Sequence, residues 1–132
     1  MSTDESICLT LAAEPGSIGV ARRAVADLAE GHGVTERVLG DVKTVVTEAC
    51  TNVVKHAYPL GNGQFEVEAA SLNDSLSIVV RDFGVGVRVP VNGGEPSTRL
   101  GLRLISRIAN GVEIRGDSAG SEIRMRLPLL LS

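Results

Sequence analysis

The chain has 132 residues, a formal net charge of -3 and 43% hydrophobic residues, which is enough apolar material for one aliphatic core in one domain. Its 13 basic residues are scattered, aromatic residues make up only 2% and tryptophan is missing, so no direct nucleic-acid partner is expected. No apolar run approaches the roughly 20 residues that span a bilayer, and the N-terminus lacks a basic leader region, so a cytoplasmic protein without a membrane partner is expected.

The first half of the chain predicts one strand followed by two helices. Residues 7–12 alternate apolar and polar side chains, as a half-buried strand does. A helix is expected from Ser17, its predicted cap, to the glycine-rich break at 31–33. A longer helix begins at Thr35, carries apolar residues at a spacing of three and four, and stops at residues 58–59.

The second half predicts two hairpins separated by a loop and a helix. Strands are expected at 64–71 and 75–81, joined by a short turn. Residues 84–98 are rich in glycine and proline and lack periodicity, which is typical of a long functional loop. A helix over 100–110 and a hairpin with strands at 112–116 and 121–127 complete the chain.

This order of elements predicts the fold class. Strands joined by short turns must be antiparallel, and helices gathered on one face give a two-layer α/β (α+β) sandwich with a mixed, mainly antiparallel sheet. The opposite face is then expected to be polar or covered by a partner. One domain spanning residues 1–132 is expected, and a doubly wound parallel fold is excluded. Cys8 and Cys50 lack metal-ligand spacing and are expected to be reduced structural thiols.

Three polar features stand out along the chain. Glu48, Asn52 and His56 follow one another at intervals of four residues and form a strip on one flank of the long helix. On spacing alone, they are also consistent with a solvated flank. Asp82 ends a predicted strand and is followed by glycines at alternate positions, which suits recognition of an exocyclic amine but is also ordinary turn chemistry. Residues 100–102 begin the next helix and offer backbone N–H groups to phosphate.

In this order, the features resemble the motifs of the histidine-kinase-like (Bergerat) ATPases, most closely those of the anti-sigma-factor serine kinases. Residues 48–58 (EACTNVVKHAY) resemble the N box, and residues 82–86 (DFGVG) resemble the G1 box. Residues 98–105 (TRLGLRLI) resemble the G2 box, and residues 120–126 resemble the final strand. The resemblance covers nearly the whole chain and implies a Bergerat-type ATP-binding fold.

The resemblance also implies roles for individual residues. Asn52 would coordinate Mg2+ that bridges the phosphates of ATP, and Glu48 would act as general base or position a water molecule. Asp82 would hold the adenine amino group. Gly84 and Gly86 would shape the nucleotide pocket, and residues of about 87–99 would form an ATP lid. The G2-box residues at the phosphate-binding helix start would be Thr98, Arg99, Gly101 and Leu102. Arg22 would be a partner or phosphate contact.

The function implied by the resemblance is that of a serine-protein kinase and anti-sigma factor. Such a protein phosphorylates an anti-sigma-factor antagonist and sequesters a sigma factor in a partner switch. The apolar C-terminus and the uncovered sheet face suggest a homodimer. Arg103 stands where the G2 pattern usually has a second glycine. The alternative is therefore a non-catalytic ATP-binding anti-sigma or adaptor module. The catalytic half of a histidine kinase is disfavoured, because His32 and His56 are the only histidines and no dimerisation hairpin precedes the ATPase region.

Overall fold

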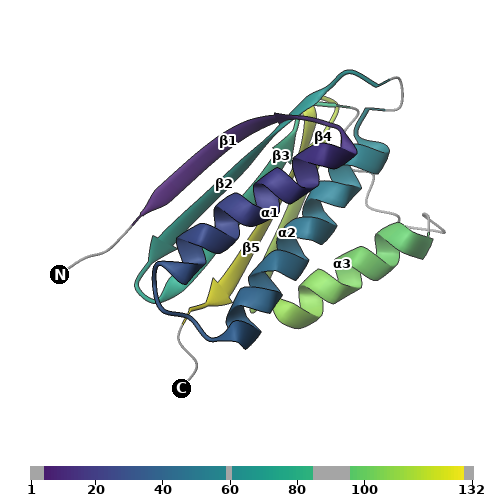
Figure 1. Ribbon diagram of the computed structural model, residues 1–132. Helices are drawn as coiled ribbons and strands as arrows, with labels where there is room; N and C mark the ends of the chain where they lie inside the picture. Colours follow the sequence, from purple (N-terminus) through teal and green to yellow (C-terminus); the bar gives the residue numbers. More distant parts are fainter. Residues whose placement is uncertain (1–4, 59–60, 85–95, 130–132) are drawn as a thin grey trace.

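A computed structural model describes residues 5–58, 61–84 and 96–129, with only the backbone of 96–100 (Figure 1). The predicted succession of strands and helices is confirmed. The elements are β1 (Ser6–Ala12), α1 (Pro15–Glu30), α2 (Glu36–His56), β2 (Gln64–Leu72), β3 (Ser75–Asp82), α3 (Pro96–Ile108), β4 (Gly111–Asp117) and β5 (Gly120–Pro128).

The strands form one sheet in the order β1-β2-β3-β5-β4, and all three helices lie on one of its faces (Figure 1). The predicted two-layer sandwich is confirmed. The sheet is more uniform than predicted, because each of the four strand pairings in the described residues is antiparallel. The reason is topological: β5 turns back from β4 and lies beside β3, so no described pair needs a parallel crossover.

The core lies between the sheet and α2, which runs between α1 and α3 (Figure 1). Residues at alternate positions of the strands and at helical spacing on α2 meet there, as the sequence periodicity predicts. They include Val42, Val45, Val46 and Ala49 of α2, Phe65 and Val67 of β2, Ile78 and Val80 of β3, and Ile123 and Met125 of β5. Leu129 is also buried in this core, so it does not contribute to an apolar surface at the C-terminus.

Two helices begin earlier than predicted. α1 begins at Pro15, so Ser17 lies inside the helix and is buried instead of capping it. α3 begins at Pro96 and ends at Ile108, earlier at both ends than the predicted 100–110. Proline suits the first turn of a helix because its missing N–H is not needed there. The predicted start of α2 is confirmed, since the Thr35 side chain accepts a hydrogen bond from the Val38 N–H at 3.2 Å.

The outer face of the sheet is polar, which is one of the two predicted outcomes. The Arg81 guanidinium bridges Glu66 at 3.0 Å, Glu68 at 3.2 Å and Glu122 at 3.0 Å. Burial alone would raise the pKa of Glu122, but hydrogen bonds from Arg81 and Arg124 lower it overall. Opposite charges are therefore paired across three adjacent strands on this face. Within the described residues, no helix is long and apolar enough to span a membrane.

Candidate functional site

Asp82 at the end of β3 is a buried carboxylate with fixed partners. It is only 2% exposed. The Ser121 hydroxyl of β5 donates to Oδ2, and the Gly84 N–H donates to Oδ1 at 3.1 Å. Burying a charged group is costly unless it is hydrogen-bonded, and these two donors reduce that cost. A carboxylate has about four lone-pair sites, so Asp82 can still accept a hydrogen bond from a ligand amine.

Two glycines allow the backbone to close tightly around Asp82. A Cβ atom at Gly84 would lie 2.0 Å from the carbonyl oxygen of Ala57, at the C-terminal end of α2. A Cβ atom at Gly120 would lie 2.1 Å from the carbonyl oxygen of Asp82, and Gly120 also has a φ of +143°. Any other residue would separate these segments. The structure thus brings the predicted Asp82 and Gly84 together and adds Gly120 and Ser121.

Sequence reasoning assigned no role to Ser121 or Gly120. Ser121 faces Asp82 because β5 pairs with β3 in a register that sets these two residues opposite each other. This pairing joins residues 39 positions apart in the chain. The available signal was the Gly120-Ser121 pair at the start of the final strand, but only the strand order identifies Asp82 as its partner.

Glu48 and Asn52 lie one turn apart on α2, and both are partly buried. The Glu48 carboxylate reaches α3: a Cβ atom at Gly101 would lie 2.7 Å from Oε2. Within the described residues, no hydrogen bond or ion pair engages the carboxylate of Glu48 or the amide of Asn52. The predicted acid and the G2-box glycine therefore meet between α2 and α3, one turn from the predicted amide.

The early start of α3 changes what Gly101 and Leu102 can do. They lie in the second turn of the helix and not at its start, as was predicted. The N–H groups without intrahelical partners belong to the first turn, which contains Thr98 and Arg99. Leu102 packs against the core, and Arg103 is exposed. Residues 96–99, predicted as the end of the lid, are helical, while Gly86 and residues 87–95 lie outside the described residues.

Arg22 on α1 is hydrogen-bonded to α2. Its Nη1 donates to the Thr47 hydroxyl at 3.4 Å, and Thr47 directly precedes Glu48. The Arg22 side chain is exposed, so the cation is accessible from solvent. His56, the third residue of the predicted strip on α2, is partly buried.

The residues present fit a Mg2+ ion whose ligands come partly from phosphates and water better than a metal centre built from protein ligands alone. In the part of the chain that the structure describes, no group of three His, Cys, Asp or Glu residues could hold a metal ion. Mg2+ commonly takes one or two oxygens from the protein and the others from phosphates and water. The Asn52 amide oxygen, one turn from the Glu48 carboxylate, suits such a site.

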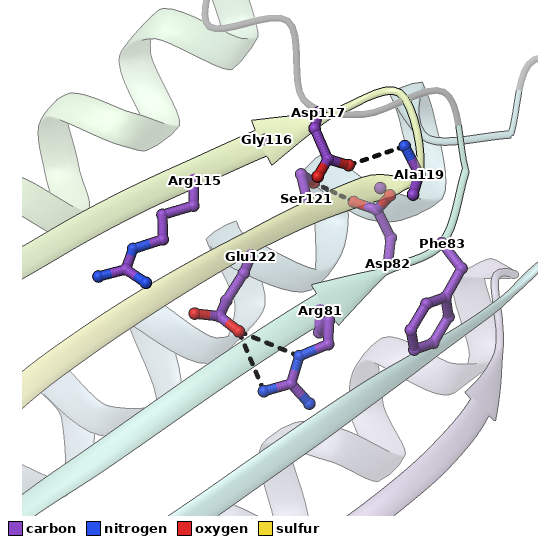
Figure 2. A pocket seen from close by; sticks show the side chains of 10 residues that line it. Arg81, Asp82, Phe83, Arg115, Gly116, Asp117, Ala119, Ser121 and Glu122 are labelled. Carbon is purple, nitrogen blue, oxygen red and sulfur yellow. Dashed lines mark hydrogen bonds and ion pairs between the residues drawn. The ribbon is translucent and has the colours of Figure 1, made fainter.

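A separate pocket of about 360 Å3 opens at the ends of β3, β4 and β5 (Figure 2). It is lined by Asp82 and Ser121 and by outward-facing Arg81, Arg115 and Glu122. Figure 2 shows Arg81 beside Glu122, and Asp82 joined to Ser121 at the strand ends. Neither Glu48 nor Asn52 lines this pocket. The pocket therefore reaches Asp82 from the sheet's outer face, away from the acid and amide of α2.

The sandwich fold, the strand-end carboxylate and the acid–amide pair on the facing helix define the class of protein. Residues 11–127 match the histidine kinase-like ATPase domain, and the chain belongs to this family. It is similar to serine-protein kinase RsbW of Halalkalibacterium halodurans, with 34% identity over 86% of this chain and 78% of the relative. Serine-protein kinase RsbW of Bacillus velezensis is 37% identical over 89% of this chain and 83% of the relative.

Solved structures support the fold. The RsbU and RsbW domains of a Mycobacterium tuberculosis protein match with a TM-score of 0.68 and 18% identity, over 94% of this chain and 32% of that one. The histidine kinase domain of a blue-light activated kinase from Erythrobacter litoralis matches with a TM-score of 0.62 and 18% identity, over 86% of this chain and 60% of that one. This chain thus spans less than two thirds of either solved chain, and the likeness concerns the fold alone.

Proposed function

We propose that this chain is an ATP-dependent serine-protein kinase and anti-sigma factor. It phosphorylates an anti-sigma-factor antagonist and sequesters a sigma factor in a partner switch. Membership of the ATPase family supports ATP as the phosphoryl donor, and the names of the relatives support a serine acceptor. The observation that carries the proposal is the Glu48 carboxylate, which lies against Gly101 and one turn from Asn52.

The proposed reaction assigns one task to each polar group. Asp82 accepts a hydrogen bond from the adenine amine. Asn52 contributes an oxygen to Mg2+, which neutralises phosphate charge when bound. Glu48 accepts the proton of the serine hydroxyl as its oxygen attacks the γ-phosphorus. The bond from that phosphorus to the β–γ bridging oxygen breaks, and ADP leaves with the electron pair.

The remaining predicted positions complete this proposal. Gly86, Thr98 and Arg99 belong to the nucleotide site, with residues 87–95 as its lid. Arg22 contacts the protein partner or the transferred phosphate, because it is exposed and hydrogen-bonded to Thr47 beside Glu48. A cytoplasmic homodimer is part of the same proposal.

The nucleotide site is tested by calorimetry with ATP and ADP, with and without Mg2+. We expect Mg2+-dependent binding to the wild type and its loss in Asn52→Ala, because the variant lacks the amide oxygen. Asn110→Ala is the matched control, since Asn110 is exposed between α3 and β4. Equal Mg2+-dependent binding to the wild type and Asn52→Ala would remove Asn52 from the metal site.

The kinase activity is tested with labelled ATP and an anti-sigma-factor antagonist protein. Glu48→Gln is expected to lose phosphoryl transfer while it keeps nucleotide binding, and Glu30→Gln, at an exposed position, should behave as the wild type. A wild-type protein that binds ATP but yields no phosphoserine would contradict the kinase. That outcome would favour the non-catalytic adaptor.

A further inference from the structure

Tyr58 lies just beyond the C-terminal end of α2, and its hydroxyl joins two segments that are distant in the chain. The hydroxyl accepts a hydrogen bond from the Phe83 N–H at 2.9 Å and donates one to the Gln64 carbonyl. Phe83 directly follows Asp82, and Gln64 begins β2. A single phenol therefore ties the helix of Glu48 and Asn52 to the loop that follows β3.

The ring of Tyr58 is held as closely as its hydroxyl. A Cβ atom at Gly63 would lie 2.2 Å from the ring carbon Cγ, and one at Gly84 would lie 3.0 Å from Cε1. No side chain at residue 63 can fit unless the ring moves. The two glycines thus leave a slot for the ring between the start of β2 and the loop after β3.

These contacts reach the adenine-reading carboxylate through the backbone. Tyr58 holds the amide of Phe83, and Asp82 is hydrogen-bonded to the N–H of the next residue, Gly84. Because Tyr58 fixes residue 83, it restricts both Asp82 and the Gly84 N–H that donates to the Asp82 carboxylate. The same phenol sets the distance of Asp82 from α2, which carries Glu48 and Asn52.

We propose that Tyr58 is a positioning residue for base selection, which fixes Asp82 so that adenine is preferred over purines with a carbonyl group at the same ring position. This inference rests on the proposed ATP site. Adenine offers an amine that donates to Asp82, whereas hypoxanthine offers an acceptor that a fixed carboxylate rejects. A loosely held Asp82 can turn away from that acceptor, so selectivity falls.

The test compares Tyr58→Phe with the wild type in binding ATP and inosine triphosphate. The variant loses two hydrogen bonds, of which the one from the Phe83 N–H bears on Asp82. Loss of that bond predicts about a fivefold weaker affinity for ATP, with a smaller loss for inosine triphosphate. The ATP preference should therefore fall. Thr44→Val is the matched control, because it removes an exposed α2 hydroxyl that donates to the Gly40 carbonyl and should keep the wild-type preference.

A second measurement is amide hydrogen exchange, and its wild-type arm needs no variant. In the wild type without nucleotide, the Phe83 amide should exchange slowly with solvent, and in Tyr58→Phe it should exchange faster. An unprotected Phe83 amide in the wild type would overturn the inference, as would an unchanged ATP preference in a folded Tyr58→Phe variant. A protected Phe83 amide in a wild type that binds no ATP would instead contradict the proposed function and, with it, base selection.

Discussion

The carboxylate of Glu48 on α2 lies against Gly101 on α3, so closely that a Cβ atom at residue 101 would come 2.7 Å from Oε2. The atom that the new Cβ would meet is Oε2, at the end of the flexible Glu48 side chain. Gly101→Ala should therefore displace the carboxylate and leave the helices in place. Misplacement of a reacting group by about 1 Å can cost about 100-fold in rate. We expect a loss of that order in phosphoryl transfer, measured with labelled ATP and an antagonist protein.

Stability should move in the opposite direction from activity in Gly101→Ala. Alanine favours a helix by about 1 kcal/mol over glycine. This gain should exceed the cost of moving the flexible Glu48 side chain, so the free energy of unfolding should rise. Gly40→Ala on α2 is the matched control, since the added Cβ would meet no atom within 4 Å beyond its neighbours and the backbone of its own helix. It should gain a similar helix preference and keep wild-type transfer. A large loss of stability in Gly101→Ala would show that the helices themselves are pushed apart.

The hydrogen bond from Ser121 to Asp82 should stabilise the fold as well as the site. Ser121→Ala removes a donor from a buried carboxylate, which costs about 1–3 kcal/mol in the free energy of unfolding. Urea denaturation measures this loss. Ser106→Ala, at an exposed position on α3, should stay within about 0.5 kcal/mol of the wild type. Equal midpoints for the two variants would mean that water replaces the serine hydroxyl.

Acid should weaken the charge cluster on the outer face of the sheet. The pKa of Glu122 is lowered in the folded protein, since hydrogen bonds from Arg81 and Arg124 outweigh the effect of burial. This stabilisation is present above the unfolded pKa of about 4.3 and is lost as the pH falls through the folded pKa. Glu122→Gln should therefore flatten the dependence of unfolding free energy on acidic pH.

The control for the acid experiment is Glu113→Gln. The Glu113 side chain is 63% exposed and pairs with Arg115 at 3.5 Å, so its contribution is screened by solvent. If the free energy of unfolding of Glu122→Gln still falls steeply at acidic pH, the acid sensitivity belongs to other carboxylates.

The two thiols should react at very different rates. Burial raises the pKa of Cys50 to about 12, so almost none of it is thiolate at neutral pH, whereas Cys8 is exposed on β1. A thiol reagent should label one site in the native protein and two after denaturation, as mass spectrometry can count. Cys8→Ser should remove native labelling, and labelling of Cys50 in that folded variant would contradict its burial.

The sequence alone determined the elements whose signal is local. The helical spacing on α2 identified the strip of Glu48 and Asn52, and the Thr35 cap gave its start. Alternating side chains located the strands, and the turn at Asn73 and Asp74 joins two of them with the positive φ angles that a tight hairpin needs. Local patterns suffice there because burial and turn geometry act on residues that are close in the chain.

Only the tertiary structure decided which distant residues meet. The pairing of Ser121 with Asp82 depends on β5 lying beside β3, and the contact of Glu48 with Gly101 depends on how α3 packs against α2. The starts of α1 and α3 at prolines also differ from the local prediction, and Ser17 is buried inside α1 instead of capping it. Periodicity reports which face of an element is buried, but the partner on that face is chosen by strand order, register and packing across the whole core.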